Sequence, residues 1–202
     1  MKFYAKLVFG AAAYLFLSAG IAGTASQPPA EGGKLPEIIL TVPLDTELRQ
    51  YLGVGGKETF TIPEIKAEVV LIEIFSMYWP FCQKEAPSVN EMYRRIESSE
   101  QLKGKVKLIG IGVGNSAFEV GYFKKVYNIP FPLFPDGEFE IHKKLGEVRT
   151  PYFIGIRIMG AGSYKIYYSK LGGANNADEL MKMLLKDSGL EGLTIDDWRL
   201  LI

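Results

Sequence analysis

The sequence contains a single cysteine, Cys82, and a single histidine, His142. One cysteine cannot form a disulfide within the chain, so any disulfide chemistry must be intermolecular. Zinc and haem sites draw on several such ligands, and the isolated His142 in a lysine-rich stretch is expected to be a solvated surface residue. We therefore predict no metal ion and no other cofactor.

The sequence also lacks an excess of charge, because 23 basic residues balance 23 acidic ones. No long-range field draws such a chain to nucleic acid or to an acidic membrane surface. Residues 110–114 read GIGVG, but the stretch lacks the G-x-G-x-x-G spacing of a dinucleotide-binding loop and the acidic residue expected at the next strand end. Nucleic-acid binding and dinucleotide binding are therefore not expected.

One long uncharged run, residues 7–23, follows two lysines near the N-terminus and precedes three small residues. This cationic, apolar and small-residue layout is typical of a secretory signal. The run is somewhat short for a bilayer span of about 20 residues, yet an uncleaved anchor stays open. We expect residues 1–25 to be a signal peptide or an N-terminal anchor, which predicts a periplasmic or other extracytoplasmic protein with membrane contact only through that segment.

The rest of the chain divides into three parts by composition. Residues 26–36 combine Pro, Gly and Ser with few apolar groups and read as a flexible leader. Residues 37–190 have the length and apolar content of one domain. Residues 191–202 form a C-terminal tail whose apolar side chains, Trp198 among them, are expected to pack on the domain or on a partner.

Within the domain, apolar runs of strand type alternate with segments of helical periodicity. We expect strands at residues 38–42, 69–75, 106–112, 131–134, 152–158 and 164–169, and helices at 80–100, 116–127, 139–145 and 178–186. Leu180, Met181, Met183 and Leu184 read as the core side of the last helix. Strands that alternate with helices predict an α/β fold with a central sheet covered on both faces, and the hairpin near the end makes the sheet mixed.

The most informative stretch is residues 73–87, EIFSMYWPFCQKEAP. It resembles the strand, loop and helix of thioredoxin-like proteins, whose Trp-Cys-x-x-Cys motif follows a buried strand. The resemblance is closest to the exported redoxin branch of TlpA-like thiol-disulfide oxidoreductases, and it extends over residues 58–186. If Cys82 takes the place of the family's second cysteine, Trp79 stands where the first, nucleophilic cysteine belongs, and Pro80 and Phe81 lie between them.

Other positions agree with this alignment. Glu73 falls on the acidic residue that thioredoxins bury beneath the dithiol, and Tyr78 on the aromatic residue before the first cysteine. Pro87 falls on the proline of the following helix. The resemblance further implies a thioredoxin fold, and it matches Thr150 and Pro151 to the cis-proline segment that faces the redox loop and offers backbone groups to a bound peptide.

In this alignment the chain keeps only the second of the two cysteines with which the family acts in cell redox homeostasis. Disulfide exchange begins with attack by the thiolate of the first cysteine, which an indole cannot perform. We expect Cys82 to be buried under Trp79 and its apolar neighbours and to react weakly. Glu73 remains open as a proton-transfer group or as a structural, hydrogen-bonded acid.

Two further functions stay open for this degenerate motif. One is a non-catalytic module that holds an extended peptide or protein client between residues 78–81 and Thr150 and Pro151. The other is a one-cysteine thiol peroxidase, because peroxiredoxins share the fold and need one attacking cysteine. Their motif places threonine three residues and proline seven residues before that cysteine, where this sequence has Trp79 and Phe75.

Overall fold

The computed structural model describes residues 27–160, 162–172 and 176–190, so the predicted signal segment and tail lie outside the described residues. Among the described residues, no helix has the length and apolar character needed to cross a membrane. The elements are β1 (Ile39–Thr41), α1 (Thr46–Leu52), β2 (Thr59–Thr61), η1 (Ile62–Glu64), β3 (Val69–Phe75), α2 (Pro80–Ser98), β4 (Val106–Val113), α3 (Ala117–Val126), β5 (Leu133–Asp136), α4 (Glu140–Lys144), β6 (Tyr152–Gly160), β7 (Ser163–Leu171) and α5 (Ala177–Leu185).

Five strands form the central sheet in the order β5-β4-β3-β6-β7. The central strand β3 pairs parallel with β4 and antiparallel with β6, so the sheet is mixed, as the sequence predicts. Every residue of β3 is buried, because both faces of the sheet are covered. β1 and β2 form a separate two-stranded sheet.

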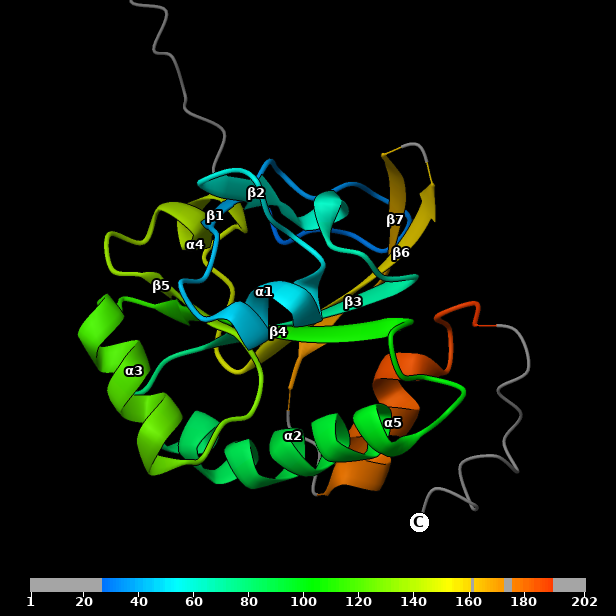
Figure 1. Ribbon diagram of the computed structural model, residues 1–202. Helices are drawn as coiled ribbons and strands as arrows, with labels where there is room; N and C mark the ends of the chain where they lie inside the picture. The colour runs from blue at the N-terminus through cyan, green and yellow to red at the C-terminus, as the bar shows by residue number, and fades with distance from the viewer. Residues whose placement is uncertain (1–26, 161, 173–175, 191–202) are drawn as a thin grey trace, which may run out of the picture.

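Helices cover both faces of the sheet (Figure 1). On one face, α2, α3 and α5 share an apolar cluster with Val69, Leu71 and Phe75 of β3. On the other, α1, α4 and the β1–β2 sheet share a second cluster with the alternate residues of that strand. This division follows from the two-residue period of a strand. Glu73 therefore lies on the face that α2 covers.

Four elements differ from the sequence prediction. α1, β2 and η1 were not expected. Asp45 caps α1 by accepting hydrogen bonds from two backbone N–H groups, and the helix ends at Gly53 in the left-handed conformation. β5 begins at Leu133, two residues later than expected. Phe131 is instead a buried core residue, and the first contact with β4 is the hydrogen bond from the N–H group of Gly110 to the carbonyl of Pro132 at 2.9 Å.

Part of the predicted leader contacts the domain. The N–H group of Gly32 donates to the carbonyl of Ile166 at 2.7 Å, and the N–H group of Ile166 donates to Gly33 at 3.3 Å. Pro29 and Leu35 are buried. This stretch therefore covers the outer edge of β7, and packed structure begins before residue 37, where we expected the domain to start.

Candidate functional site

A short loop, residues 76–79, joins β3 to α2 and brings Cys82 into the first turn of the helix. Trp79 is the N-cap residue of α2, and Pro80 is its first residue, where the missing N–H group has no helical partner to lose. Cys82 is the third residue, and Pro87 lies inside the helix. The loop thus follows the strand-loop-helix order that the sequence predicts.

The thiol of Cys82 is fully buried. The N–H group of Ser76 donates to Sγ at 3.5 Å, and the side chain of Thr150 also hydrogen-bonds the thiol. Burial nevertheless dominates and raises the pKa of Cys82 to about 11, with the charge of Glu73 acting in the same direction. The group is therefore a protonated thiol at neutral pH.

Two carboxyl groups, those of Glu73 on β3 and Glu85 on α2, are buried beside the thiol. Burial first, and the charge of Glu85 second, raise the pKa of Glu73 to about 8. The carboxylate of Glu85 lies close to Gly172: a Cβ atom added at position 172 would be 2.9 Å from Oε2 of Glu85. Any larger residue at position 172 would therefore displace this carboxylate.

Three aromatic side chains next to Cys82 in the sequence are exposed. The exposed fractions are 62% for Tyr78, 46% for Trp79 and 63% for Phe81. The rings of Trp79 and Phe81 lie 5.7 Å apart between centroids. Cys82 is buried as expected, in the apolar cluster beneath α2, whereas Trp79 precedes the first helical residue and lies half in solvent.

Polar side chains fix the loop from both sides. Oδ1 of Asn115 accepts from the N–H group of Met77 at 2.9 Å, and Nε2 of Gln83 donates to the Met77 carbonyl at 2.7 Å. The hydroxyl of Tyr78 donates to the carboxylate of Glu119. None of these roles was predicted. The position of Asn115 could have been inferred from the sequence. This residue follows β4, and the carboxyl end of β4 lies beside that of the parallel strand β3.

The peptide bond between Thr150 and Pro151 is cis. Pro151 is buried, and its carbonyl accepts a hydrogen bond from the N–H group of Gly172 at 2.8 Å. Thr150 is half-buried, and among the described residues its backbone groups have no backbone hydrogen-bond partner. His142 is half-buried rather than solvated, because Nε2 bonds the carbonyl of Val148 at 2.8 Å.

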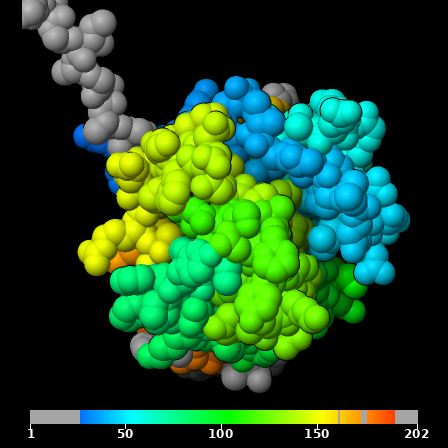
Figure 2. Space-filling view, turned by 90° about the vertical axis from the view of Figure 1, so that its left-hand side faces the viewer, coloured from blue at the N-terminus to red at the C-terminus, as the bar shows by residue number. Residues whose placement is uncertain are grey.

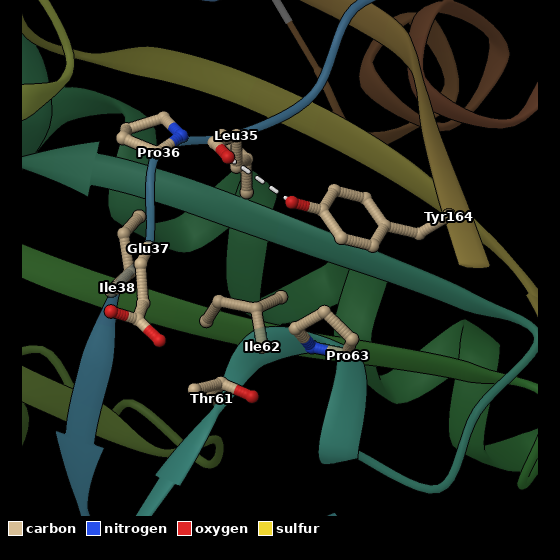
Figure 3. Close-up of a pocket in the computed structure, with 8 residues that line it drawn as sticks. All are labelled: Leu35, Pro36, Glu37, Ile38, Thr61, Ile62, Pro63 and Tyr164. Carbon is tan, nitrogen blue, oxygen red and sulfur yellow. Dashed lines mark hydrogen bonds between the residues drawn. The ribbon is translucent and has the colours of Figure 1, made fainter. Parts of the chain in front are cut away.

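A separate pocket of about 240 Å³ is lined by residues of β2 and η1 and by the segment before β1 (Figure 3). Its apolar lining belongs to the cluster on the face of the sheet opposite Cys82. The hydroxyl of Tyr164 crosses this region to donate to Leu35. Within the described part of the chain, no group of three or more His, Cys, Asp or Glu side chains is arranged to hold a metal ion. The pocket and the thiol therefore form no common site.

The sequence profile of the AhpC/TSA family matches residues 35–162. No curated protein sequence gives a significant match. Several solved structures have a similar fold at low identity. A thiol:disulfide interchange protein from Bacteroides sp. has a TM-score of 0.58 and 16% identity over 83% of this chain and 95% of its own.

Two further structures extend the comparison. The thioredoxin domain of a thiol-disulfide oxidoreductase from Bacteroides vulgatus has a TM-score of 0.55 and 16% identity over 77% of this chain and 98% of its own. A secreted disulfide oxidoreductase from Mycobacterium tuberculosis, homologous to E. coli DsbE, has a TM-score of 0.52 and 18% identity over 74% and 95%. The fold of the described residues is therefore a thioredoxin fold.

Proposed function

The chain belongs to the AhpC/TSA family, and we propose that it is an exported thioredoxin-like protein that binds an extended segment of a client protein without performing dithiol exchange by itself. One observation carries the proposal. The only thiol of the chain is fully buried and its pKa is raised to about 11, while the half-exposed indole of Trp79 precedes the helix where a redox protein needs its attacking sulfur.

The surroundings of Cys82 support a binding role. An extended peptide gains affinity from main-chain hydrogen bonds and specificity from contacts with its side chains. Thr150 has backbone groups without a backbone partner among the described residues, and Tyr78, Trp79 and Phe81 offer exposed aromatic surface. Aromatic side chains provide large contact areas at low entropic cost. The client is accordingly an extended peptide or protein segment, and contact with nucleic acid is not part of the proposal.

Export is supported by the layout of residues 1–25, which has the three parts of a secretory signal. The similar structure from Mycobacterium tuberculosis is also described as secreted. Cleavage of the segment gives a free extracytoplasmic domain, and retention gives one tethered to the membrane. N-terminal sequencing of the exported protein distinguishes these two forms.

The test measures catalysis and binding on the same protein. With dithiothreitol as reductant, insulin reduction should proceed at the rate of a Cys82→Ser control. An array of extended peptides should yield binders that lose at least tenfold in affinity on Trp79→Ser or Phe81→Ser. Met159→Ser is the matched control, since Met159 is 59% exposed near the end of β6. Insulin turnover well above the Cys82→Ser control would reject the non-enzymatic proposal.

A second candidate is a one-cysteine reaction of Cys82 with peroxide or a client disulfide. Two groups that hydrogen-bond the sulfur, the Ser76 N–H and the Thr150 side chain, favour this candidate because they lower the pKa of the thiol. Hydrogen peroxide consumption in the presence of excess thiol measures it. Consumption that disappears in Cys82→Ser would establish this reaction in place of the inert thiol.

A further inference from the structure

Five exposed aromatic residues, which we name the aromatic patch, lie on the loop, on α2 and on α3: Tyr78, Trp79, Phe81, Phe118 and Tyr122. Phe118 is 80% exposed and Tyr122 is 54% exposed, and their spacing of four residues puts them on one face of α3. The hydrogen bond from Tyr78 to Glu119, which follows Phe118, ties the loop to the same helix.

The segments that carry the patch are neighbours on the surface. In Figure 2, the segment around residues 78–85 and the segment around residues 117–126 lie next to one another on the face toward the viewer. Concentrated exposed aromatic surface is unusual for a protein without a partner and marks a site of interaction. The patch therefore calls for an apolar occupant.

Two exposed cations border the same region. Lys84 lies one helical turn beyond Phe81 on α2, and Arg149 immediately precedes Thr150. Within the described part of the chain, neither side chain forms an ion pair. An occupant that carries acidic residues beside its apolar ones would complement both the charge and the aromatic surface.

The chain itself contains a segment of this chemistry. Residues 194–202 read TIDDWRLLI, with Asp196 and Asp197 directly before Trp198 and three aliphatic residues after Arg199. The acidic pair matches the cations at the border of the patch, and Trp198 matches its rings. No other stretch of the sequence joins two adjacent acids to a tryptophan.

The position of the last described residues decides whether the segment reaches the aromatic patch of its own chain or that of another copy. The carbonyl of Ser188 accepts from Arg157, which is paired with Val69, the first residue of β3. The patch begins just beyond Phe75, the last residue of β3, so the two lie at opposite ends of the sheet. The eight residues from Leu190 to Trp198 span at most about 28 Å when fully extended.

The route along α2 is about as long as this reach. α2 has 19 residues and runs between the two ends of the sheet, which makes it about 28 Å long. The tail would therefore reach the patch of its own chain only if it were stretched taut, whereas the patch of a neighbouring copy imposes no such limit. We propose that residues 194–202 of one copy of the chain occupy the aromatic patch of a second copy.

This interaction makes the tail a competitor of the client at the surface used in the proposed function. The inference rests on the patch and the tail, and its test needs no client. Failure to find a client peptide leaves the tail interaction standing, and failure of the tail interaction leaves the client site standing.

The test uses the two tryptophans of the sequence, Trp79 and Trp198. In a Trp79→Phe chain, which keeps an aromatic ring in the patch, all tryptophan emission comes from Trp198. At micromolar concentration we expect blue-shifted emission and at least threefold weaker acrylamide quenching than in the same chain with Phe81→Ser and Phe118→Ser. Adding the control substitution Met159→Ser to the Trp79→Phe chain should leave the quenching of Trp198 unchanged.

Sedimentation equilibrium completes the test. The Trp79→Phe chain should associate into dimers or larger species, and dilution to monomer should restore strong quenching of Trp198. Trp198→Ser should remain monomeric at concentrations where the parent chain associates. Quenching of Trp198 that is insensitive to the two patch substitutions would overturn the proposal, as would shielding of Trp198 that persists in the monomer.

Discussion

The floor and the rim of the site have opposite properties. On the floor, Cys82, Glu73 and Glu85 are ionisable groups buried from solvent, whereas on the rim Tyr78 and Trp79 are aromatic and exposed. Thiol catalysis needs the reverse arrangement, with an accessible, ionised sulfur at the surface. The architecture of the site therefore does not depend on redox chemistry.

The reason lies in what holds the loop. Asn115 and Gln83 bind the two backbone groups of Met77, and Pro80 starts α2 directly after Trp79. None of these contacts involves a reactive sulfur. The loop therefore keeps its geometry without a sulfur at its surface, and the exposed rim is available for binding.

The largest expected effect concerns the accessibility of the floor. With its pKa at about 11, Cys82 has roughly 300-fold less thiolate at neutral pH than an ordinary cysteine of pKa ~8.5. The thiol reagent DTNB should therefore label the native protein at least 300-fold more slowly than the protein in denaturant. Rapid labelling of the folded chain would show that the floor is open and would revive a one-cysteine mechanism.

Placing a thiol on the rim should restore exchange. Trp79→Cys puts two cysteines three residues apart at the start of α2, with their Cβ atoms about 5–6 Å apart, and small loop adjustments then permit a disulfide. Insulin reduction should rise at least tenfold above the parent chain. The engineered thiol is exposed like the indole it replaces, so it can attack a substrate, and Cys82 can then release the mixed disulfide.

Two controls accompany Trp79→Cys. Trp79→Ser separates the new thiol from loss of the indole, and Trp79→Cys combined with Cys82→Ser separates a pair of thiols from a single one. Both should stay at the background rate. Thiol titration before and after oxidation should show that the pair closes; two thiols that never pair in the folded variant would contradict the alignment of Trp79 with the first cysteine.

The buried acid should make stability depend on pH. The pKa of Glu73 is raised to about 8 in the folded chain, so the unfolded chain ionises first and stability is lost as pH rises from about 4.5 to about 8. The loss is on the order of 1.4 kcal/mol per pH unit in that window. Urea unfolding across this range should show that Glu73→Gln removes most of the slope.

Glu85→Gln is the matched control for Glu73→Gln. It leaves Glu73 in place but removes a negative charge that helps to raise its pKa. The slope should therefore persist and end at a lower pH. Equal slopes in Glu73→Gln and in the parent chain would mean that Glu73 does not hold its proton in the folded protein.

Most of the fold could be predicted because its central elements have strong local signals. β3 is a run of β-branched and apolar residues interrupted only by Glu73, and it was predicted with its observed bounds. α1 was missed because its seven residues carry only one buried side chain, Leu52, so its amphipathic pattern is too short to recognise. β5 was displaced because Phe131 is a buried core residue that does not pair with β4.

The site was only partly predictable for a different reason. Burial of Cys82 and Glu73 follows from their places on a helix and a strand that face the core, and the motif itself pointed to both. The partners Asn115 and Glu119 come from a loop and a helix that the sequence places about 40 residues away. The exposure of Trp79 depends on its position before the first turn of α2, and a large apolar residue gives no local sign of that.

The smallest expected effect concerns the rim itself. Because Trp79 is 46% exposed, Trp79→Ala should lower the free energy of unfolding by only about 1–2 kcal/mol, since little more than half of its apolar area is protected from water. Phe75→Ala is the reference on the floor side: Phe75 is fully buried and stacks on Phe123 at 4.9 Å, so its loss should cost about 3–5 kcal/mol.

Urea denaturation of both variants at pH 6 compares the rim and the floor directly. A contact surface tolerates truncation of its aromatic residues because they serve an occupant rather than the core, and Trp79→Ala should then weaken peptide binding far more than it weakens the fold. A loss of stability for Trp79→Ala as large as that for Phe75→Ala would mean that the indole supports the loop. In that case Trp79 would be part of the packed interior, and the contrast between an exposed rim and a buried floor would be wrong.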